Sequence, residues 1–261
     1  MPIEPSTIAI TGKGGVGKTS FTALLLKALL AHTHKKILVI DADPAANLAD
    51  VLGIPLQTTV GQIIDKTKRE VEKKPDFYDG GALLEFRLWE DALLEGPRFH
   101  FIAMGHTSGR GCYCMIHDLL SYMLGNIQSF YDLILLDMDA GLEHISRNTK
   151  RELNLTFLLT DPSQMGFNTV RRIIELAQEL HNLMGKFLLV GNMFSTDKDQ
   201  EKLRRLTDVL QIPLFGVIPR DENITRMNLY GNPLMDIPLQ SSAYQAVDCA
   251  LITLIKEMQL L

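Results

Sequence analysis

The sequence predicts an α/β fold, a single domain over residues 1–261 with a mainly parallel sheet of about seven strands flanked by helices. Seven short runs of Val, Ile, Leu and Phe are almost continuously apolar, which is typical of parallel strands that are covered on both faces. Helix-length segments lie between most of these runs, and strands that alternate with helices form βαβ units. No internal repeat or low-complexity linker divides the chain, which favours one domain.

Each strand is expected where apolar residues dominate a five-residue run: Thr7–Thr11, Lys36–Ile40, Phe99–Ala103, Asp132–Leu136, Leu155–Leu159, Lys186–Val190 and Leu214–Ile218. The helices are expected in the longer segments between and after them: Thr19–Ala31, Met115–Gly125, Gln164–His181, Lys198–Leu210 and Ser241–Leu260. Residues 56–96 interrupt this alternation with a charged run, Asp65–Lys74, and the only tryptophan of the chain, Trp89. We expect a helical insertion there, mostly a solvated face, and assign it no chemistry.

The charge balance argues against one class of partner. Lys and Arg number 26 against 31 Asp and Glu, a net charge of −5, so bulk charge would not hold nucleic acid or anionic lipid. The longest uncharged stretch, Val51–Ile64, has 14 residues, whereas a membrane span needs about 20. No basic region of a secretory signal follows Met1, and three cysteines suit a reducing compartment. We expect a cytoplasmic protein with no nucleic-acid or membrane partner.

A phosphate-binding loop follows the first expected strand. Residues Gly12–Thr19 read GKGGVGKT, which matches GxxxxGK[ST] between a strand and a helix, as a P-loop NTPase domain requires. Glycines let successive backbone N–H groups surround a phosphate, and the helix N-terminus adds positive potential. Lys18 is expected to reach the β- and γ-phosphates of ATP, and the Thr19 hydroxyl to bind Mg²⁺. The residues expected to hold the nucleotide here are Gly12, Gly14, Gly15, Val16, Gly17, Lys18, Thr19 and Ser20.

A second lysine, Lys13, lies in the first half of this loop, where a side chain tends to point away from the phosphates that its own loop surrounds. A cation at that place can serve a nucleotide held by a second copy of the chain, as an arginine finger does, and such a charge is worth roughly 10³–10⁵ in rate. A solvent-facing lysine is the alternative.

Acidic residues follow two of the expected strands: Asp41 and Asp43 after Lys36–Ile40, and Asp137 after Asp132–Leu136. Ligands of open parallel sheets bind outside the carboxyl ends of the strands, so these acids should face the phosphates. Asp137 is expected to assist Mg²⁺, Asp43 to orient the attacking water, and Asp41 to support either role. The alternative is that each acid caps a following helix.

Taken together, Gly12–Thr19, Asp41–Pro44 and Leu135–Asp137 resemble the deviant-Walker-A ATPases, the class that includes MinD, ParA, the arsenite-pump ATPase and the nitrogenase iron protein. The resemblance spans essentially the whole chain and implies ATP hydrolysis, ATP-dependent homodimers and a Lys13 that crosses to the partner's phosphates. It also implies that Asn192 and Pro219 frame the adenine; ordinary strand-end punctuation is the alternative. Asp139 lies where positioning ATPases of the class commonly have proline.

Two cysteines, Cys112 and Cys114, open the expected helix after a glycine-broken loop, and a helix N-terminus favours the thiolate form. The pair supplies two ligands where a closed soft-metal site wants four, and a two-fold dimer axis beside it would bring four thiolates together. Thiolates take Zn²⁺ as well as Ni²⁺, and geometry separates the two metals. Two buried apolar cysteines are the default alternative. Cys249, in the last helix, is expected to fill the core.

A wider string, Met104-Gly105, Gly111–Cys114 and Gly141–His144, resembles the CooC group of nickel-insertion accessory ATPases of carbon monoxide dehydrogenase, with close relatives that serve acetyl-CoA synthase. This resemblance implies that Cys112 and Cys114 bind nickel at a dimer interface and that such an apo-enzyme is the client. His106 and His117 flank the pair and are left outside the expected site.

Two other functions stay open. One is an electron-transfer protein like the nitrogenase iron protein, with an iron–sulfur cluster on the dimer axis, which the four thiolates fit by number. The other is a positioning ATPase of the ParA or MinD kind on DNA or membrane. The net charge and a last helix whose only cation is Lys256 argue against the second.

Overall fold

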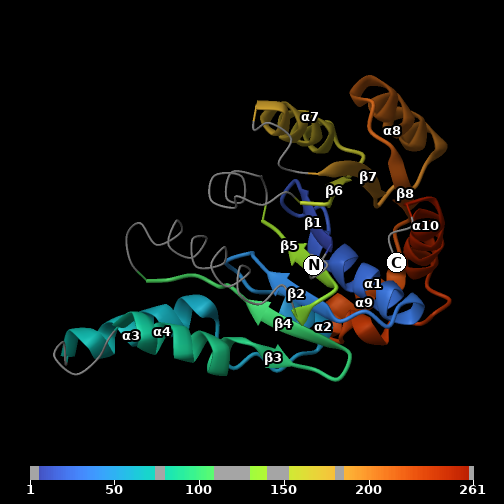
Figure 1. The fold of residues 1–261 in the computed structure, drawn as a ribbon. Coiled ribbons are helices and arrows are strands. Elements are labelled where there is room, and N and C mark those ends of the chain that lie inside the picture. Colours follow the sequence, from blue (N-terminus) through green and yellow to red (C-terminus); the bar gives the residue numbers. More distant parts are fainter. Residues whose placement is uncertain (1–5, 74–79, 109–129, 140–152, 180–184, 259–261) are drawn as a thin grey trace.

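The computed structural model describes residues 6–73, 80–108, 130–139, 153–179 and 185–258. Its eight strands form one sheet in the order β3-β4-β2-β5-β1-β6-β7-β8 (Figure 1). All neighbouring strands pair in parallel except β3 and β4, which pair antiparallel. The strands are β1 (Ser6–Gly12), β2 (Ile37–Asp41), β3 (Leu94–Glu95), β4 (Phe99–Ala103), β5 (Leu133–Asp137), β6 (Leu155–Thr160), β7 (Lys186–Asn192) and β8 (Leu214–Ile218).

Helices connect the strands and cover the sheet. The α-helices are α1 (Lys18–His32), α2 (Leu48–Leu52), α3 (Val60–Lys73), α4 (Gly80–Arg87), α7 (Gln164–Glu179), α8 (Asp197–Leu210), α9 (Glu222–Tyr230) and α10 (Ser242–Met258). Two short segments have other helical forms, the π-helix η1 (Leu88–Ala92) and the 3₁₀-helix η3 (Leu234–Asp236).

Two apolar cores lie against the sheet. One joins alternate strand residues, such as Leu38 and Leu136, to residues of α3, α7 and α8; the other joins Val39 and Leu135 to residues of α1, α2, α9 and α10. Neighbouring strand residues therefore point to opposite cores. Strands β2, β5 and β6 are buried along their whole length. This burial on both faces explains why these strands read as continuous apolar runs.

The seven expected strands and the mainly parallel sheet are confirmed. The eighth, β3, has only two residues, and it pairs through Leu94 and Glu95 with Phe101 and His100. Helices α3 and α4 occupy the expected insertion and extend from the sheet (Figure 1). The expected helix Met115–Gly125 lies outside the described residues.

The prediction for Cys249 is wrong, because its side chain is exposed. Helix α10 buries Val247, Leu251 and Leu254 instead. Residue 249 is two positions beyond Val247, and residues two apart on a helix do not face the same side. Within the part of the chain that is described, no helix is both long enough and apolar enough to cross a membrane.

Candidate nucleotide site

The carboxyl ends of the central strands β1, β2 and β5 lie side by side. This end of the sheet is called the phosphate edge. Asp41 and Asp137 are partners in the parallel register of β2 and β5, and Asp137 is also the register partner of Ile10 in β1. The three strands are linked beyond their ends, because Ala42 N donates to Asp137 O at 2.8 Å and Met138 N donates to Ile10 O at 3.0 Å. The sheet therefore brings the two acidic strand ends beside the glycine-rich loop, as expected for a ligand crevice.

The loop between β1 and α1 depends on its glycines. Gly12 has φ +151°, and a Cβ there would overlap the carbonyl oxygen of Leu159 on β6. Gly17 has φ +89°, and a Cβ there would lie 2.5 Å from Asn192 Nδ2. Both positions favour glycine because of their positive φ, and at Gly12 a clash with backbone adds a steric reason. The loop backbone can approach its neighbours closely only because these side chains are missing.

Lys18 is the first residue of α1 and is buried at the centre of the loop. Its exposed fraction is 7%, and its Nζ lies 3.4 Å from Gly12 O and 3.5 Å from Lys13 O. The ammonium group is therefore held inside the curve of the loop by backbone carbonyls. This places a positive charge where the loop's backbone would surround a phosphate.

Asp137 has one oxygen that is ready for a cation. Thr22 Oγ1 donates to Asp137 Oδ1 at 3.1 Å, whereas Oδ2 is buried and has no hydrogen-bond partner among the residues that the structure describes. Burial raises the pKa of Asp137 to about 6, although the Thr19 and Thr22 hydroxyls and the Lys18 ammonium act to lower it. A hard divalent cation with oxygen ligands fits this group, because it would neutralise a carboxylate that burial destabilises.

Asp41 is buried and holds the turn that follows β2. Its Oδ1 accepts a hydrogen bond from Asp43 N at 3.1 Å and its Oδ2 accepts one from Leu48 N, at the start of α2, at 2.9 Å. Burial and the neighbouring Asp137 raise the pKa of Asp41 to about 7. Part of the alternative interpretation thus holds for this residue, since its carboxyl group supports the first turn of α2.

Asp43 lies farther out and is partly exposed. Its Oδ1 accepts a hydrogen bond from Ala45 N at 2.8 Å, which closes a turn over Pro44. The same turn holds Ala46 at φ +51°, where Ala46 N donates to Asp43 O at 3.0 Å. The turn fixes the backbone of Asp43, and one carboxylate oxygen, Oδ2, takes no part in it.

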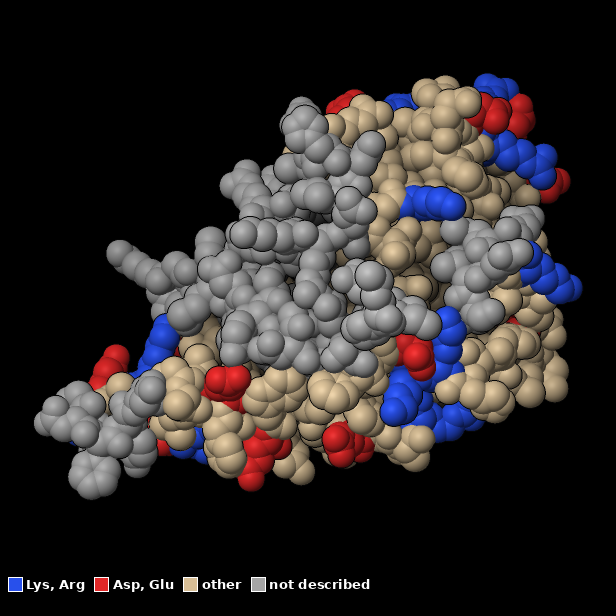
Figure 2. Space-filling view, viewed as in Figure 1, with Lys and Arg blue, Asp and Glu red and all other residues tan. Residues whose placement is uncertain are grey.

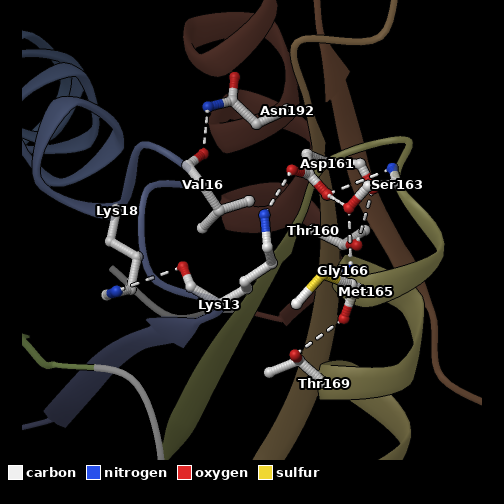
Figure 3. A network of polar contacts seen from close by, with 10 residues as sticks. All are labelled: Lys13, Val16, Lys18, Thr160, Asp161, Ser163, Met165, Gly166, Thr169 and Asn192. Carbon is white, nitrogen blue, oxygen red and sulfur yellow. Dashed lines mark hydrogen bonds and ion pairs between the residues drawn. The ribbon is translucent and has the colours of Figure 1, made fainter.

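Lys13 forms an ion pair that sequence reasoning did not predict. Its Nζ lies 3.1 Å from Oδ2 of Asp161, the residue after β6, and the two side chains are 27% and 18% exposed. In Figure 3 the Lys13 side chain points to Asp161 and away from Lys18. The Ser163 hydroxyl and N–H bond the other oxygen of Asp161, and Gly166 N donates to Ser163 Oγ at 3.0 Å. The start of α7 therefore holds Asp161 in place.

The same rule that identified the other acids could have identified Asp161, because it also follows a buried parallel strand at the carboxyl end of the sheet. Burial acts to raise the pKa of Asp161, but hydrogen bonds from Ser163 and Lys13 and the charge of Lys13 outweigh it and lower the pKa. The carboxylate is therefore the favoured partner of the Lys13 ammonium.

A pocket of about 480 Å³ lies beside the glycine-rich loop and contains both residues expected to frame an adenine. Asn192, at the end of β7, donates from Nδ2 to Val16 O at 2.8 Å, and Pro219 follows β8. Phe21 and Ile224 contribute apolar walls. The volume lies in the range of small-ligand sites, so a base has room next to the phosphate loop.

Cys112, Cys114 and His117 lie outside the described residues, which include the segment leading to the pair as far as Ser108. It leaves β4 at the same sheet edge, where Met104 N donates to Asp41 O at 2.8 Å. Ser108 N and Oγ both donate to Asp65 Oδ2 on α3, at 2.8 and 2.5 Å. His106 is exposed. The segment is thus tied to the phosphate edge at one end and to the helical insertion at the other.

The fold and the loop define a class, a P-loop nucleotide-binding protein with a helix-covered, mainly parallel sheet. Residues 7–234 match the CobQ/CobB/MinD/ParA nucleotide binding domain family. The chain belongs to this family and is an ATPase.

Several related proteins match most of its length. An uncharacterised ATP-binding protein of Methanocaldococcus jannaschii is 35% identical over 244 residues, 92% of this chain and 95% of that protein. The carbon monoxide dehydrogenase accessory protein CooC of Rhodospirillum rubrum is 29% identical over 240 residues, 88% of this chain and 89% of that protein. The solved structure of MinD from Pyrococcus horikoshii with Mg-ADP covers 98% of this chain and 99% of its own, with a TM-score of 0.71 and 23% identity. The last comparison supports the fold.

Proposed function

We propose that the chain is an ATP-hydrolysing metallochaperone that dimerises with nucleotide and binds nickel through Cys112 and Cys114, for insertion into an apo carbon monoxide dehydrogenase or acetyl-CoA synthase. The observation that carries this proposal is the position of the segment leading to the cysteines. That segment leaves the sheet at the phosphate edge, where Met104 N donates a hydrogen bond to Asp41 O. A change at the phosphates can therefore act directly on the backbone that leads to the metal ligands.

In this proposal the nucleotide's phosphates lie in Gly12–Thr19, with Lys18 on the β- and γ-phosphates. Thr19 and Asp137 hold Mg²⁺, which supplies a positive charge that stabilises the developing negative charge on the phosphates. Asp43 orients the attacking water with its free carboxylate oxygen. The Oδ2 atom of Asp137, which has no hydrogen-bond partner in the described part of the chain, and the position of Lys18 support this assignment. Asn192 and Pro219 would bracket the base.

Dimerisation gives Lys13 and the cysteines their roles. Lys13 would leave Asp161 and reach the nucleotide of the partner subunit. Two copies of the C-x-C pair would meet near the two-fold axis and give four thiolates to one ion, Ni²⁺ in the client reaction or Zn²⁺ in the same site. The relationship to the accessory protein CooC supports this reading.

Two observations weigh against a positioning ATPase on membrane or DNA, the function that the MinD relatives suggest. The apolar face of α10 packs on α1 and β8, so in the described part of the helix that face is covered by the protein itself. Basic residues (blue) and acidic residues (red) both occur on the face seen in Figure 2, and neither sign dominates its coloured residues. Neither feature provides a lipid- or DNA-binding surface of the usual kind.

The test is the metal content per chain with and without ATP, measured beside the molecular mass in solution. We expect one Ni²⁺ per two chains in the nucleotide-bound dimer. Replacing Cys112 and Cys114 together by serine should abolish it, whereas the matched control Cys249→Ser should keep it. Brown anaerobic protein with iron and sulfide would instead favour the electron-transfer function. Unchanged nickel binding in the double variant, or ATP-dependent binding to DNA or anionic vesicles, would reject the proposal.

A further inference from the structure

A second pocket, of about 580 Å³, lies at the opposite end of the sheet from the phosphate loop. Its lining comes from the first residues of β2 and β4, from the residues just before β2 and β5, from the β3–β4 hairpin and from η1. Figure 1 shows the β3–β4 hairpin at the edge of the sheet. The two sites lie at opposite ends of β2. Ile37, its first residue, lines this pocket, and Asp41, its last, lies four residues or about 13 Å further along the strand. A ligand here would not touch a nucleotide in the loop.

The lining has an excess of positive charge. Three basic residues, Lys35, Lys36 and Arg98, line the pocket, against one acidic lining residue, Glu95. Arg98 is held in place, since its Nη2 donates to the carbonyl oxygen of Leu30 at the end of α1. Asp132 Oδ2 accepts a hydrogen bond from the backbone N–H of Lys36 at 2.8 Å, but Asp132 does not line the pocket. The net lining charge of about +2 matches a phosphate monoester, which carries about −1.5 to −2 at neutral pH.

The same pocket is lined by aromatic rings. Trp89, Phe99, Phe130 and Tyr131 contribute to its walls, and Phe130 is 68% exposed. Flat rings favour ligands with a flat apolar body, which stack on them at little entropic cost.

A fixed polar pair lies among these rings. Tyr131 Oη and His100 Nδ1 are 2.7 Å apart, with their rings edge to face at 5.4 Å. Burial and the Glu95 carboxylate raise the pKa of Tyr131 to about 12, so this hydroxyl remains protonated. The pocket thus combines apolar walls with a few positioned polar groups, which is the usual make-up of a small-molecule site.

We propose that this pocket binds a small phosphate monoester with an aromatic or heteroaromatic body, at a site separate from the ATP site. Lys36 and Arg98 contact the phosphate, and the ring of the ligand stacks between Trp89 and the other aromatic walls. The site connects to the ATPase through β2, whose first residue lines it and whose last residue, Asp41, lies at the phosphate edge. The inference does not depend on the role of the cysteines.

Trp89 is the only tryptophan of the chain, so its fluorescence reports on this pocket alone. Phenyl phosphate is titrated into the Lys18→Ala variant, in which the phosphate loop is impaired, and binding is followed by Trp89 emission and by calorimetry. Inorganic phosphate tests the charge alone and phenol tests the ring alone. AMP, in a separate arm, tests whether a nucleoside body serves as well as a simple ring. We expect one phenyl phosphate per chain, bound at least about tenfold more tightly than phosphate or phenol.

Arg98→Gln and Lys36→Gln should each weaken phenyl phosphate binding by about tenfold, because each removes one charged hydrogen bond. The matched control is Lys186→Gln, an exposed lysine at the start of β7, and it should change nothing. Neither pocket variant should alter basal ATP hydrolysis, since neither residue is near the phosphate loop. The proposal fails if calorimetry finds no saturable binding, if phosphate alone binds as tightly, or if Lys186→Gln weakens binding as much as Arg98→Gln. Native fluorescence of each variant without ligand confirms that it is folded.

Discussion

The Lys13–Asp161 ion pair predicts how readily the chain dimerises. Asp161→Asn keeps the shape of the side chain and removes its charge, so Lys13 is no longer held by its own subunit. The Nζ–Oδ2 distance is 3.1 Å and the two side chains are 27% and 18% exposed. The free energy by which such a pair stabilises the subunit should lie between two values. Exposed ion pairs contribute up to about 1 kcal/mol, and hydrogen bonds to charged groups contribute about 1.5–3 kcal/mol. We take ~1.5 kcal/mol.

The symmetry of the dimer doubles this figure. In the proposed dimer, both subunits would have to release Lys13 before two lysines could cross, so two ion pairs would be broken per dimer, at a total of ~3 kcal/mol. Removing that cost should strengthen the ATP-bound dimer by roughly a hundredfold in dissociation constant. Lys13→Ala should have the opposite effect, because it removes the cation that crosses in the proposed dimer.

Sedimentation equilibrium with a slowly hydrolysed ATP analogue measures this constant for the parent and both variants. Glu201→Gln is a matched control, because it removes the charge of a carboxylate that pairs with Arg205 on the exposed face of α8. It should leave the constant unchanged. If Asp161→Asn dimerises no more tightly than the parent chain, Lys13 is not restrained by Asp161 and the reasoning is refuted.

Three further predictions concern the nucleotide site. Gly12→Ala should abolish nucleotide binding and destabilise the fold by more than about 2 kcal/mol, measured by urea unfolding, because its methyl group overlaps a backbone oxygen of β6; a folded, ATP-binding variant would contradict this. Asn192→Ala should weaken ADP binding by about tenfold in calorimetry, because the loop loses the hydrogen bond to Val16 O, and an unchanged affinity would exclude that role. The nucleotide-free protein should lose stability as the pH rises from about 4 to 7. Burial raises the pKa of Asp41 to about 7 and that of Asp137 to about 6. The folded state therefore keeps protons in this range that the unfolded state releases. The loss from Asp41 is at most roughly 4 kcal/mol, and urea midpoints that rise over this range would contradict the assignment.

The sequence allowed the central strands and the phosphate loop to be predicted because both are local patterns. A buried parallel strand such as β5 is apolar throughout, and GKGGVGKT is contiguous. Strand β3 could not be predicted in this way, since two residues have no periodicity and only the pairing with β4 defines them. The position of Cys249 next to the apolar stripe of α10 suggested burial, but its side chain is exposed because it lies on another side of the helix.

Contacts between distant parts of the chain could not be predicted from the sequence, because they depend on the fold. Lys13 and Asp161 are 148 residues apart, and the topology that places β6 beside β1 brings them together. The pocket at the amino ends of β2, β4 and β5 is likewise assembled from separate segments. Lys36 and Arg98 belong to no sequence motif, and Trp89 lies in the insertion that was expected to be mostly a solvated face.

The measurement that tests the account most directly is the affinity for ATP analogue with and without Ni²⁺, beside the affinity for Ni²⁺ with and without the analogue. If one dimer couples the two ligands, each must change the affinity of the other by the same factor, because the coupling free energy is reciprocal. We expect a matched factor of about 5–150, which is lost when Cys112 and Cys114 are both replaced by serine. Identical affinities in the presence and absence of the other ligand would contradict it.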